Sequence, residues 1–333
     1  MRLFWPSLVQ GILGSQSARN APQEHLPLAR AWKSRRNRGQ TVIMTEDALL
    51  RNPLGSRTQP VMRKTKIIVS VLLAIFFGIS GLAVAQESQP YHLGFDRNVY
   101  PGDDLLPALH KTFEWTGYWL NNPPGANRNT WAGKREMMKA AGFGFAVLYN
   151  GRLYNELKGK NPAQIGQKDG RDAAARANAE GFRAGAIIFI DQEQGGRMLE
   201  EQQAYLHAWF DAVIAAGFKA GVYCSGMAAE GVVTAKDIHD HAQGRKIAIW
   251  AYNDACSPSR GCYFPKNPPS PAKSGIPYAE IWQYAQSPRR GEAKACPKNY
   301  NADGNCYPPE LPVETKTHVD LNTATSADPS QGR

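Results

Sequence analysis

One stretch near the middle of the chain joins a buried strand to two carboxylates. Residues 186–193 read Ala-Ile-Ile-Phe-Ile-Asp-Gln-Glu. An apolar run without polar alternation is typical of a strand covered on both faces, as in a parallel sheet between helices. Side chains two residues apart share a face, so Asp191 and Glu193 are expected to project together from the C-terminal end of this strand. The alternative is an acidic pair that only ends the strand and caps the next helix.

Two carboxyl groups held side by side at the edge of an apolar sheet are expected to differ in pKa. One should stay ionised while the other keeps its proton. This is the arrangement that acid–base catalysis by a pair of carboxyl groups requires, and in a (β/α) barrel the C-terminal ends of the strands are where catalytic groups lie.

The chain alternates between strand and helix patterns from residue 86 onward. Strands are predicted at 91–98, 115–121, 143–150, 186–193, 219–225, 246–252, 278–284 and 317–322, and helices at 103–113, 130–141, 169–184, 198–216 and 234–243. Such alternation predicts a parallel sheet. Eight strands in a segment of this length predict an α/β protein, a (β/α)8 TIM-type barrel over residues 86–325. In its last third, long loops replace the helices, and residues 326–333 are expected to form a disordered tail.

The basic excess of the chain is confined to its first quarter. Residues 1–85 hold 12 Lys/Arg against 3 Asp/Glu, a balance of +9, out of a formal net charge of +10. Residues 86–333 hold 27 against 26, a balance of +1. The predicted barrel therefore lacks the charge excess that a nucleic-acid partner would require.

Residues 62–85 have the pattern of a secretory signal peptide. Met-Arg-Lys-Thr-Lys precedes an apolar stretch over 67–85 that closes on Ala-Val-Ala. This predicts cleavage after Ala85 and a secreted or periplasmic protein. Because such signals act at an N-terminus, residues 1–61 are expected to be a wrongly assigned, disordered upstream extension. The alternative is an uncleaved membrane anchor, since the apolar stretch could nearly span a bilayer.

Four of the five cysteines form two pairs that are close in sequence. Cys256 and Cys262 flank one short turn, and Cys296 and Cys306 flank a polar loop. In an oxidising compartment each pair is expected to form a disulfide that staples a long loop. Cys224 is left over inside an apolar strand and is interpreted as a buried thiol rather than a nucleophile.

Metal-binding patterns are weak, and no metal or cofactor is expected. No Cys-x-x-Cys or His-rich spacing occurs. Residues 299–310 follow the spacing of a calcium-binding EF-hand loop. However, Pro297, Pro308 and Pro309 forbid the paired helices of that motif, so a plain disulfide-closed loop is the preferred interpretation.

Polar and aromatic residues gather at the predicted C-terminal ends of the strands. If the strands close into a barrel, these residues form one rim. Aromatic faces stack on sugar rings, and carboxylates and amides bind sugar hydroxyls, so the rim suits a glycan. The alternative for any single aromatic residue is a place in the core. The rim residues are Asp96, Asn121, Tyr149, Asn150, Asp191, Glu193, Tyr223, Trp250, Tyr252, Trp282, Tyr284, Asp320 and Asn322.

Four blocks resemble family 25 glycoside hydrolases, the secreted muramidases, in the order that family has them. They are Gly94-Phe95-Asp96, Asp191-Gln192-Glu193, Trp282-Gln283-Tyr284 and Val319-Asp320-Leu321-Asn322. The closer resemblance is to the glycoside-hydrolase-like group called domain of unknown function 1906, which shares this barrel. The stretch from Tyr118 to Pro124 is not a muramidase feature.

The resemblance implies a role for each acid. Glu193 would be the general acid at the glycosidic oxygen, and Asp191 would orient the 2-acetamido group of the substrate, which attacks the anomeric carbon. Asp96 and Asp320 would flank the site. The implied partner is peptidoglycan or a related N-acetyl amino sugar polymer, bound by a monomer. The competing hypothesis is a carbohydrate-binding or cell-envelope protein that kept the barrel and lost the reaction.

Overall fold

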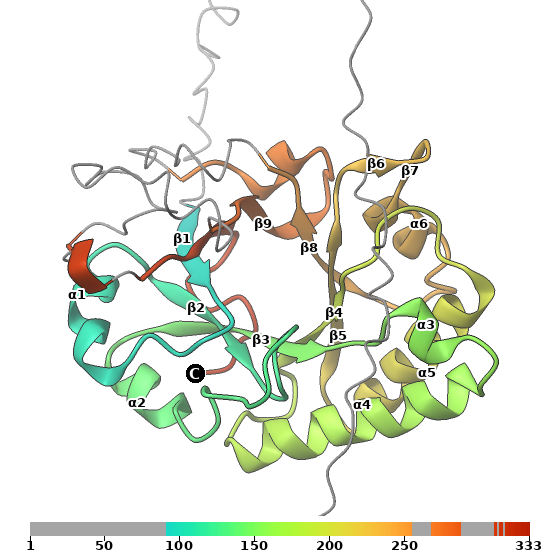
Figure 1. Ribbon diagram of the computed structural model, residues 1–333, viewed down its shortest axis with the longest axis horizontal. Helices are drawn as coiled ribbons and strands as arrows, with labels where there is room; N and C mark the ends of the chain where they lie inside the picture. The colour runs from blue at the N-terminus through green and yellow to red at the C-terminus, as the bar shows by residue number, and fades with distance from the viewer. Residues whose placement is uncertain (1–90, 255–267, 288–309, 312, 316) are drawn as a thin grey trace, which may run out of the picture. The chain divides into compact units, whose positions relative to one another are not determined.

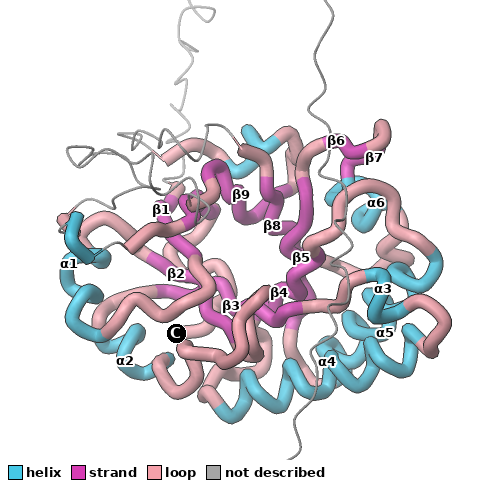
Figure 2. Tube along the Cα trace, in the orientation of Figure 1, coloured by secondary structure: helices cyan, strands magenta, loops and turns pink. Residues whose placement is uncertain are grey.

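A computed structural model describes residues 91–254, 268–287, 310–311, 313–315 and 317–333 of the chain. Eight strands close into a barrel in the order β1-β10-β9-β8-β5-β4-β3-β2. Figure 1 looks down this barrel and shows the helices outside the ring of strands, and Figure 2 separates the two by colour. The prediction of a TIM-type α/β barrel is confirmed.

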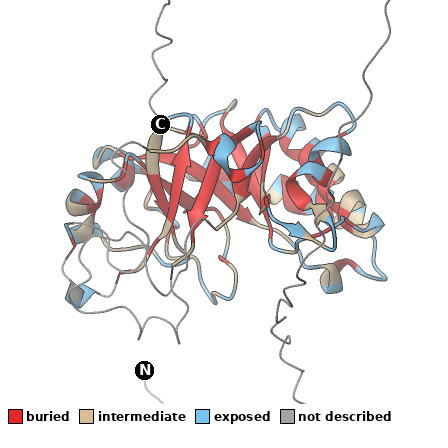
Figure 3. Cartoon of the chain, turned by 90° about the horizontal axis from the view of Figure 1, so that it is seen from above, coloured by how far each residue is buried: buried red, intermediate tan, exposed pale blue. Residues whose placement is uncertain are grey.

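The barrel strands lie within two residues of the predicted bounds, except that the last strand begins at Asp320 and not at residue 317. Their buried residues sit in the centre of the molecule, and the surrounding helices expose their outer faces (Figure 3). The strands are β1 His92–Asp96, β2 Trp115–Trp119, β3 Gly144–Asn150, β4 Ile187–Gln192, β5 Lys219–Ser225, β8 Ala248–Tyr252, β9 Ala279–Ala285 and β10 Asp320–Ala324. A small hairpin, β6 Ala228–Ala229 with β7 Val232–Val233, lies outside the barrel sheet.

The last strand corrects the prediction of a fully parallel sheet. β10 runs antiparallel to both its neighbours, pairing Asp96 of β1 with Asp320 and Ala324 with Ile281 of β9. Residues 286–319 connect β9 to β10, and in their described part the 3-10 helix η4 spans Val313–Thr315. The strand pairing itself gives the direction, since β10 lies between β1 and β9 and runs opposite to both. The first residues of β10 therefore lie at the same rim as the C-terminal ends of the other strands.

The helices cover the outside of the barrel between consecutive strands. The longest predicted ones, over 169–184 and 198–216, are present as α4 and α5, but α4 starts seven residues earlier because Asn161 caps its first turn and Pro162 begins it. The α-helices are α1 Leu106–His110, α2 Arg135–Ala140, α3 Tyr154–Leu157, α4 Pro162–Ala179, α5 Glu200–Ala215 and α6 Thr234–Asp240; 3-10 turns η1 and η2 span Asp103–Leu105 and Pro271–Ser274.

Helices α4 and α5 pack with their backbones in close approach. A Cβ atom on Gly166 would lie 2.2 Å from the carbonyl oxygen of Tyr205, and one on Gly170 would lie 2.7 Å from that of Trp209. Only glycine fits at these two positions on one face of α4. The buried aromatic residues of α5 lie against the barrel, where Trp209 contacts Tyr149 of β3.

The C-terminal tail is ordered, which corrects the prediction of a disordered segment over 326–333. Ser330 is fully buried, and its backbone donates to the carbonyl of Phe145 while accepting from Ile187. Its hydroxyl accepts from the backbone of Val147 at 2.8 Å. The tail thus satisfies backbone groups at the N-terminal ends of β3 and β4, which compensates for its polar composition.

Several predictions concern residues outside the described part of the chain. These are the signal peptide 62–85, the extension 1–61, the pairs Cys256–Cys262 and Cys296–Cys306, and most of the loop 299–310. Cys224 is described, and it is a free, fully buried thiol as predicted. Among the described segments, no helix combines the length and apolarity needed to cross a membrane.

Candidate active site

Four acidic side chains converge on one cavity in the mouth of the barrel. Asp96, Asp191, Glu193 and Asp320 all line a cavity of about 190 Å³. They come from β1, from the end of β4 and from the start of β10, strands that the chain order keeps far apart. The cavity also contains Tyr223, Trp250 and Gln283, which point inward with the same alternation as the acids. The structure therefore brings together the predicted acid set.

Asp96 is held at the centre of a buried hydrogen-bond network. Its Oδ1 accepts from Gln283 Nε2 at 2.9 Å and from Asn322 Nδ2 at 2.7 Å. Gln283 in turn accepts from the hydroxyl of Tyr223, and Asn322 accepts from the indole of Trp250. Burial and the Asp320 carboxyl raise the pKa of Asp96, while the two amide donors oppose that rise.

A glycine on the neighbouring strand makes room for Asp96. A Cβ atom on Gly117 of β2 would lie 2.6 Å from the Cβ of Asp96. A larger residue at this position would push the carboxyl out of the network. This glycine lies on a different strand from Asp96, so the residues around Asp96 in the sequence do not predict it.

Asp191 and Glu193 lie together at the end of β4, as predicted. Asp191 is 3% exposed, and its Oδ1 has no hydrogen-bond partner within the described part of the chain. Burial, Glu193 and Asp96 raise the pKa of Asp191. Glu193 is exposed at the rim, and partial desolvation by the cavity walls raises its pKa, whereas its hydrogen bond with Asp191 lowers it. Burial therefore raises the pKa of both groups, and the two carboxyl groups titrate as a coupled pair.

Asp320 is fixed by the loop that follows β9. Its Oδ1 accepts a hydrogen bond from the backbone of Ser287. Burial raises the pKa of Asp320 to about 6, although the Ser287 hydrogen bonds and the guanidinium of Arg97 oppose the rise. Arg97 is partly buried, and its Nε lacks a hydrogen-bond partner among the described residues. This guanidinium places one positive charge beside an otherwise acidic cavity.

The loop after Glu193 is hydrogen-bonded to helix α6. The hydroxyl of Thr234 accepts from the backbone of Gly196 at 2.7 Å and donates to its carbonyl. The buried carboxylate of Asp237 accepts from the backbone of Met198 at 2.7 Å. These contacts hold the segment that leaves the carboxylate pair, so Glu193 is supported from both ends.

Three of the predicted aromatic residues cannot stack on a sugar in the mouth, which corrects the sequence interpretation. Trp282 and Tyr284 flank the inward-pointing Gln283, so they face the outside of the barrel and are buried there. Trp282 donates its indole hydrogen bond to the carbonyl of Asn253. Trp250 points inward but is fully buried, in edge-to-face contact with Trp115, Phe189 and Tyr223. It forms the floor of the cavity.

The other predicted rim residues have different surroundings. Tyr223 lines the mouth cavity and donates its hydroxyl to Gln283, and Asn322 is buried beneath Asp96. Tyr252 donates to Asp254 at 2.9 Å. Tyr149 and Asn150 line a second, neighbouring cavity instead of the mouth.

The sequence interpretation missed Gln283 as a site residue. It lies between Trp282 and Tyr284 in the Trp-Gln-Tyr block. Because side chains alternate along a strand, either Gln283 or the two aromatic residues can face the barrel interior, but not both. Gln283 orients Asp96, and the residue pattern alone leaves open which set faces the barrel interior. Asn98, Trp119, Pro124 and Gln286 are further members of the cavity wall that were not predicted.

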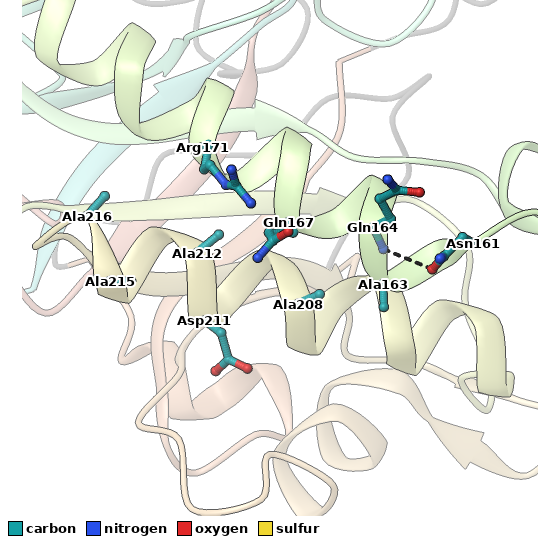
Figure 4. A pocket seen from close by; sticks show the side chains of 10 residues that line it. All are labelled: Asn161, Ala163, Gln164, Gln167, Arg171, Ala208, Asp211, Ala212, Ala215 and Ala216. Carbon is teal, nitrogen blue, oxygen red and sulfur yellow. Dashed lines mark hydrogen bonds between the residues drawn. The ribbon is translucent and has the colours of Figure 1, made fainter.

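A further groove lies away from the acids. A groove of about 850 Å³ runs along α4 and α5 and is lined largely by alanines, with Arg171 and Asp211 at its edges (Figure 4). Asp211 is already paired with Arg245. The groove contains no convergent reactive groups. In the described segments, no cluster of three or more His, Cys, Asp or Glu side chains has metal-binding geometry.

A family model matches residues 117–302, which include the carboxylate pair, Gln283 and the residues that line the second cavity, but neither Asp96 nor Asp320. The chain belongs to the Rv2525c-like, glycoside hydrolase-like domain family. The predicted resemblance to a glycoside-hydrolase-like barrel is thereby confirmed. A search among curated proteins finds no match.

Solved structures similar to this glycoside hydrolase-like domain include proteins of three bacteria. An uncharacterized B. stearothermophilus protein is 18% identical, with coverage of 70% of this chain and 95% of that one, and a TM-score of 0.44. The Mycobacterium tuberculosis Tat-secreted protein Rv2525c is 14% identical, with coverage of 71% and 96% and a TM-score of 0.44. A family 25 glycosyl hydrolase from Bacillus anthracis is 12% identical, with coverage of 72% and 91% and a TM-score of 0.40.

Proposed function

We propose that this glycoside hydrolase-like protein cleaves glycosidic bonds in peptidoglycan or a related N-acetyl amino sugar polymer. The observation that carries the proposal is the pairing of a rim-exposed Glu193 with a buried Asp191 whose Oδ1 is unpartnered, inside a cavity that also holds Asp96 and Asp320. A buried carboxylate oxygen without a partner is costly, and a donor on a ligand would satisfy it.

The chemistry follows from the positions of the two carboxyl groups. The acetamido N–H of a bound sugar would donate to Asp191, and the acetamido oxygen would attack the anomeric carbon. As that bond forms, the bond from the anomeric carbon to the glycosidic oxygen breaks, and Glu193 gives its proton to the leaving oxygen. Water then attacks the anomeric carbon, Glu193 takes a proton from it, and the acetamido group is restored.

The first step needs Asp191 ionised and Glu193 protonated. Burial raises the pKa of both groups, so the pair holds a proton more readily than free carboxyl groups do. When the acetamido N–H binds Asp191, it favours the ionised form of that group and leaves the proton to Glu193. Asp96 and Asp320 would hold sugar hydroxyls or the attacking water.

The first prediction tests Glu193 as the general acid. Glu193→Gln keeps the shape of the side chain but cannot donate the proton, so release of reducing ends from cell-wall sacculi should fall by roughly 10²–10⁴-fold. Glycan binding should survive. Glu200→Gln, an exposed residue in the first turn of α5, is the matched control and should keep wild-type activity. The raised pKa of Glu193 also predicts activity that declines as the pH rises through that pKa.

Two results would contradict this proposal. Equal rates for the wild type and Glu193→Gln would show that Glu193 is not the acid. If neither protein releases reducing sugar but both bind glycan, the chain is a carbohydrate-binding protein on the same barrel.

A further inference from the structure

A second cavity of about 740 Å³, here called the side pocket, adjoins the mouth of the barrel. The two cavities share two residues of their walls, Glu193 and Pro124. A ligand that fills both cavities must therefore pass the carboxyl group of Glu193. Among the residues that line the side pocket alone are Asn121, Asn122, Asn150, Arg152, Asp172 and Arg176.

The asparagines come from the stretch that the muramidase resemblance leaves unexplained and from the end of β3. Asn121 and Asn150 tie the two strand ends together, since Asn121 Oδ1 accepts from the backbone of Asn150 at 2.7 Å. Asn150 Nδ2 donates to the carbonyl of Asn122 at 2.9 Å. Asn122 is exposed, and no hydrogen bond within the described segments engages its Oδ1. The wall is thus rigid but retains amide groups for a ligand.

Both arginines of the side pocket are paired with carboxylates. Arg176 donates through Nε to Asp172 at 2.6 Å, and Asp172 also accepts from the hydroxyl of Tyr149. Arg152 binds the buried Asp169 and contacts Glu156. Because the lining has no excess of positive charge, the pocket favours an uncharged ligand rich in hydroxyl and amide groups over a polyanion. The guanidinium of Arg176 is half exposed and keeps its terminal nitrogens for such a ligand.

The sizes of the two cavities fit an oligosaccharide better than a single sugar. Pockets that hold a drug-sized ligand measure roughly 300–1,000 Å³. The side pocket falls in that range, whereas the mouth cavity, at about 190 Å³, is smaller. The mouth therefore holds one end of the bound segment and the side pocket holds its continuation.

We propose that the side pocket is the binding site for the sugar on the leaving-group side of the scissile bond. This inference rests on the proposed function. The sugar that is attacked lies in the mouth, with its acetamido group at Asp191, and the glycosidic oxygen lies at Glu193 where the cavities meet. The chain then runs with its reducing end over Asn122 and Arg176. The glycan has a fixed direction across the barrel mouth.

Binding to the inactive Glu193→Gln protein tests this direction. The probe is a tetramer of β-1,4-linked N-acetylglucosamine that carries a nitroxide at its reducing end. The nitroxide should broaden the NMR signals of Asn122 and Asn150 more than that of Ser287, which lies at the opposite wall beside Asp320. A nitroxide at the non-reducing end should give the reverse pattern. A reversed or unbiased pattern would overturn the proposal.

Affinity measurements give a second test. Arg176→Ala in the Glu193→Gln protein should weaken tetramer binding about tenfold, equivalent to about 1.4 kcal/mol, and should affect the tetramer more than the monomer. Asn122→Ala should act in the same sense. Arg171→Ala, on the same helix but facing the groove between α4 and α5, is the matched control.

The outcomes separate this inference from the proposed function. If the wild type releases no reducing sugar but the tetramer binds with the expected direction, the hydrolase proposal fails and the side pocket is a glycan-binding site without a leaving-group role. If the wild type hydrolyses glycan but Arg176→Ala and Arg171→Ala bind the tetramer equally well, the side pocket is not the leaving-group site. Absence of tetramer binding overturns the inference whatever the hydrolysis result.

Discussion

The position of the Asp96 carboxylate depends on residues that are far from it in the sequence. Its two hydrogen-bond donors, Gln283 and Asn322, stand 187 and 226 positions away. Asn322 also accepts from the indole of Trp250, so the carboxylate, the amide and the ring are fixed together. Buried polar networks of this kind are stable only when every member is satisfied. The carboxylate is therefore positioned by the closed barrel and not by its own strand.

The second prediction concerns Asp320. Its pKa is raised from 3.8 to about 6, so the folded protein binds this proton more tightly than the unfolded chain does. That contribution to stability is complete below about pH 4 and is lost as the pH rises through about 6. Asp320→Asn keeps the acceptor for Ser287 but removes the charge. It should increase the free energy of unfolding at pH 7 by up to about 3 kcal/mol and leave it nearly unchanged near pH 4.

Urea unfolding at the two pH values measures this difference. Asp240→Asn, a change at an exposed carboxylate on α6, is the matched control and should shift stability by less than about 0.5 kcal/mol at either pH. A loss of stability in Asp320→Asn at pH 7 would mean that the attraction between Asp320 and Arg97 outweighs the cost of burying the charge.

At the scale of elements, the direction of β10 has the largest consequence for the site. Because β10 is antiparallel to β1, Asp320 lies opposite Asp96 at the mouth. In a parallel arrangement the start of β10 would lie at the other end of the barrel, and Asp320 would be far from the remaining acids. The antiparallel direction of β10 also places the residues after Ala324 at the N-terminal ends of β3 and β4, where the tail packs.

The third prediction concerns that tail. Removing residues 326–333 deprives the backbone N–H groups of Phe145, Val147 and Ile187 of their acceptors. Each buried donor left unsatisfied costs about 1–3 kcal/mol, a large share of the roughly 5–15 kcal/mol that stabilises a domain. The truncated protein should therefore be strongly destabilised or unfolded, as measured by circular dichroism during thermal unfolding.

A milder change separates the hydrogen bonds from the length of the tail. Ser330→Ala removes only the acceptor for Val147 and should lower the free energy of unfolding by about 1–3 kcal/mol. Gln331→Ala loses only an exposed contact with Lys219 and serves as the control. Wild-type stability in the truncated protein would refute a structural role for the tail.

At the scale of the whole molecule, the fourth prediction counts thiols. Cys224 is fully buried, and burial raises the pKa of its thiol, so it should resist alkylation in the native protein at neutral pH. If Cys256 pairs with Cys262 and Cys296 with Cys306, denaturant alone should expose one reactive thiol and reduction should expose five. Mass spectrometry of the alkylated protein gives both numbers. More than one thiol before reduction would contradict the pairing.

The fifth prediction concerns export. A gene that starts at the codon for Met62 should yield an exported protein whose first residue is Gln86, because Ala-Val-Ala at 83–85 has the pattern that signal peptidases cleave. N-terminal mass spectrometry of the exported protein checks this. Retention of residues 67–85 would place the protein in the anchored class instead.

The fold and the acid set were predictable because they depend on local pattern. Unbroken apolar runs such as 186–190 determine buried strands, alternation with helices determines the α/β class, and a carboxylate at a strand end lies at the rim of the barrel. Asp96, Asp191 and Glu193 could be predicted for that reason. Asp320 was predicted at the rim as well, but at the C-terminal end of a parallel strand, whereas it begins the antiparallel β10.

What only the tertiary structure decided is the environment of these residues. The period of two along a strand predicts that Trp282 and Gln283 face opposite sides of the sheet. Which of them points inward depends on how the barrel closes. Composition favours a disordered tail, but the unsatisfied backbone groups at the floor of the barrel order it. Hydrogen bonds, desolvation and close packing act between segments that are distant in sequence. For that physical reason the residues that position the acids, and the side pocket beside them, emerge only when the chain is folded.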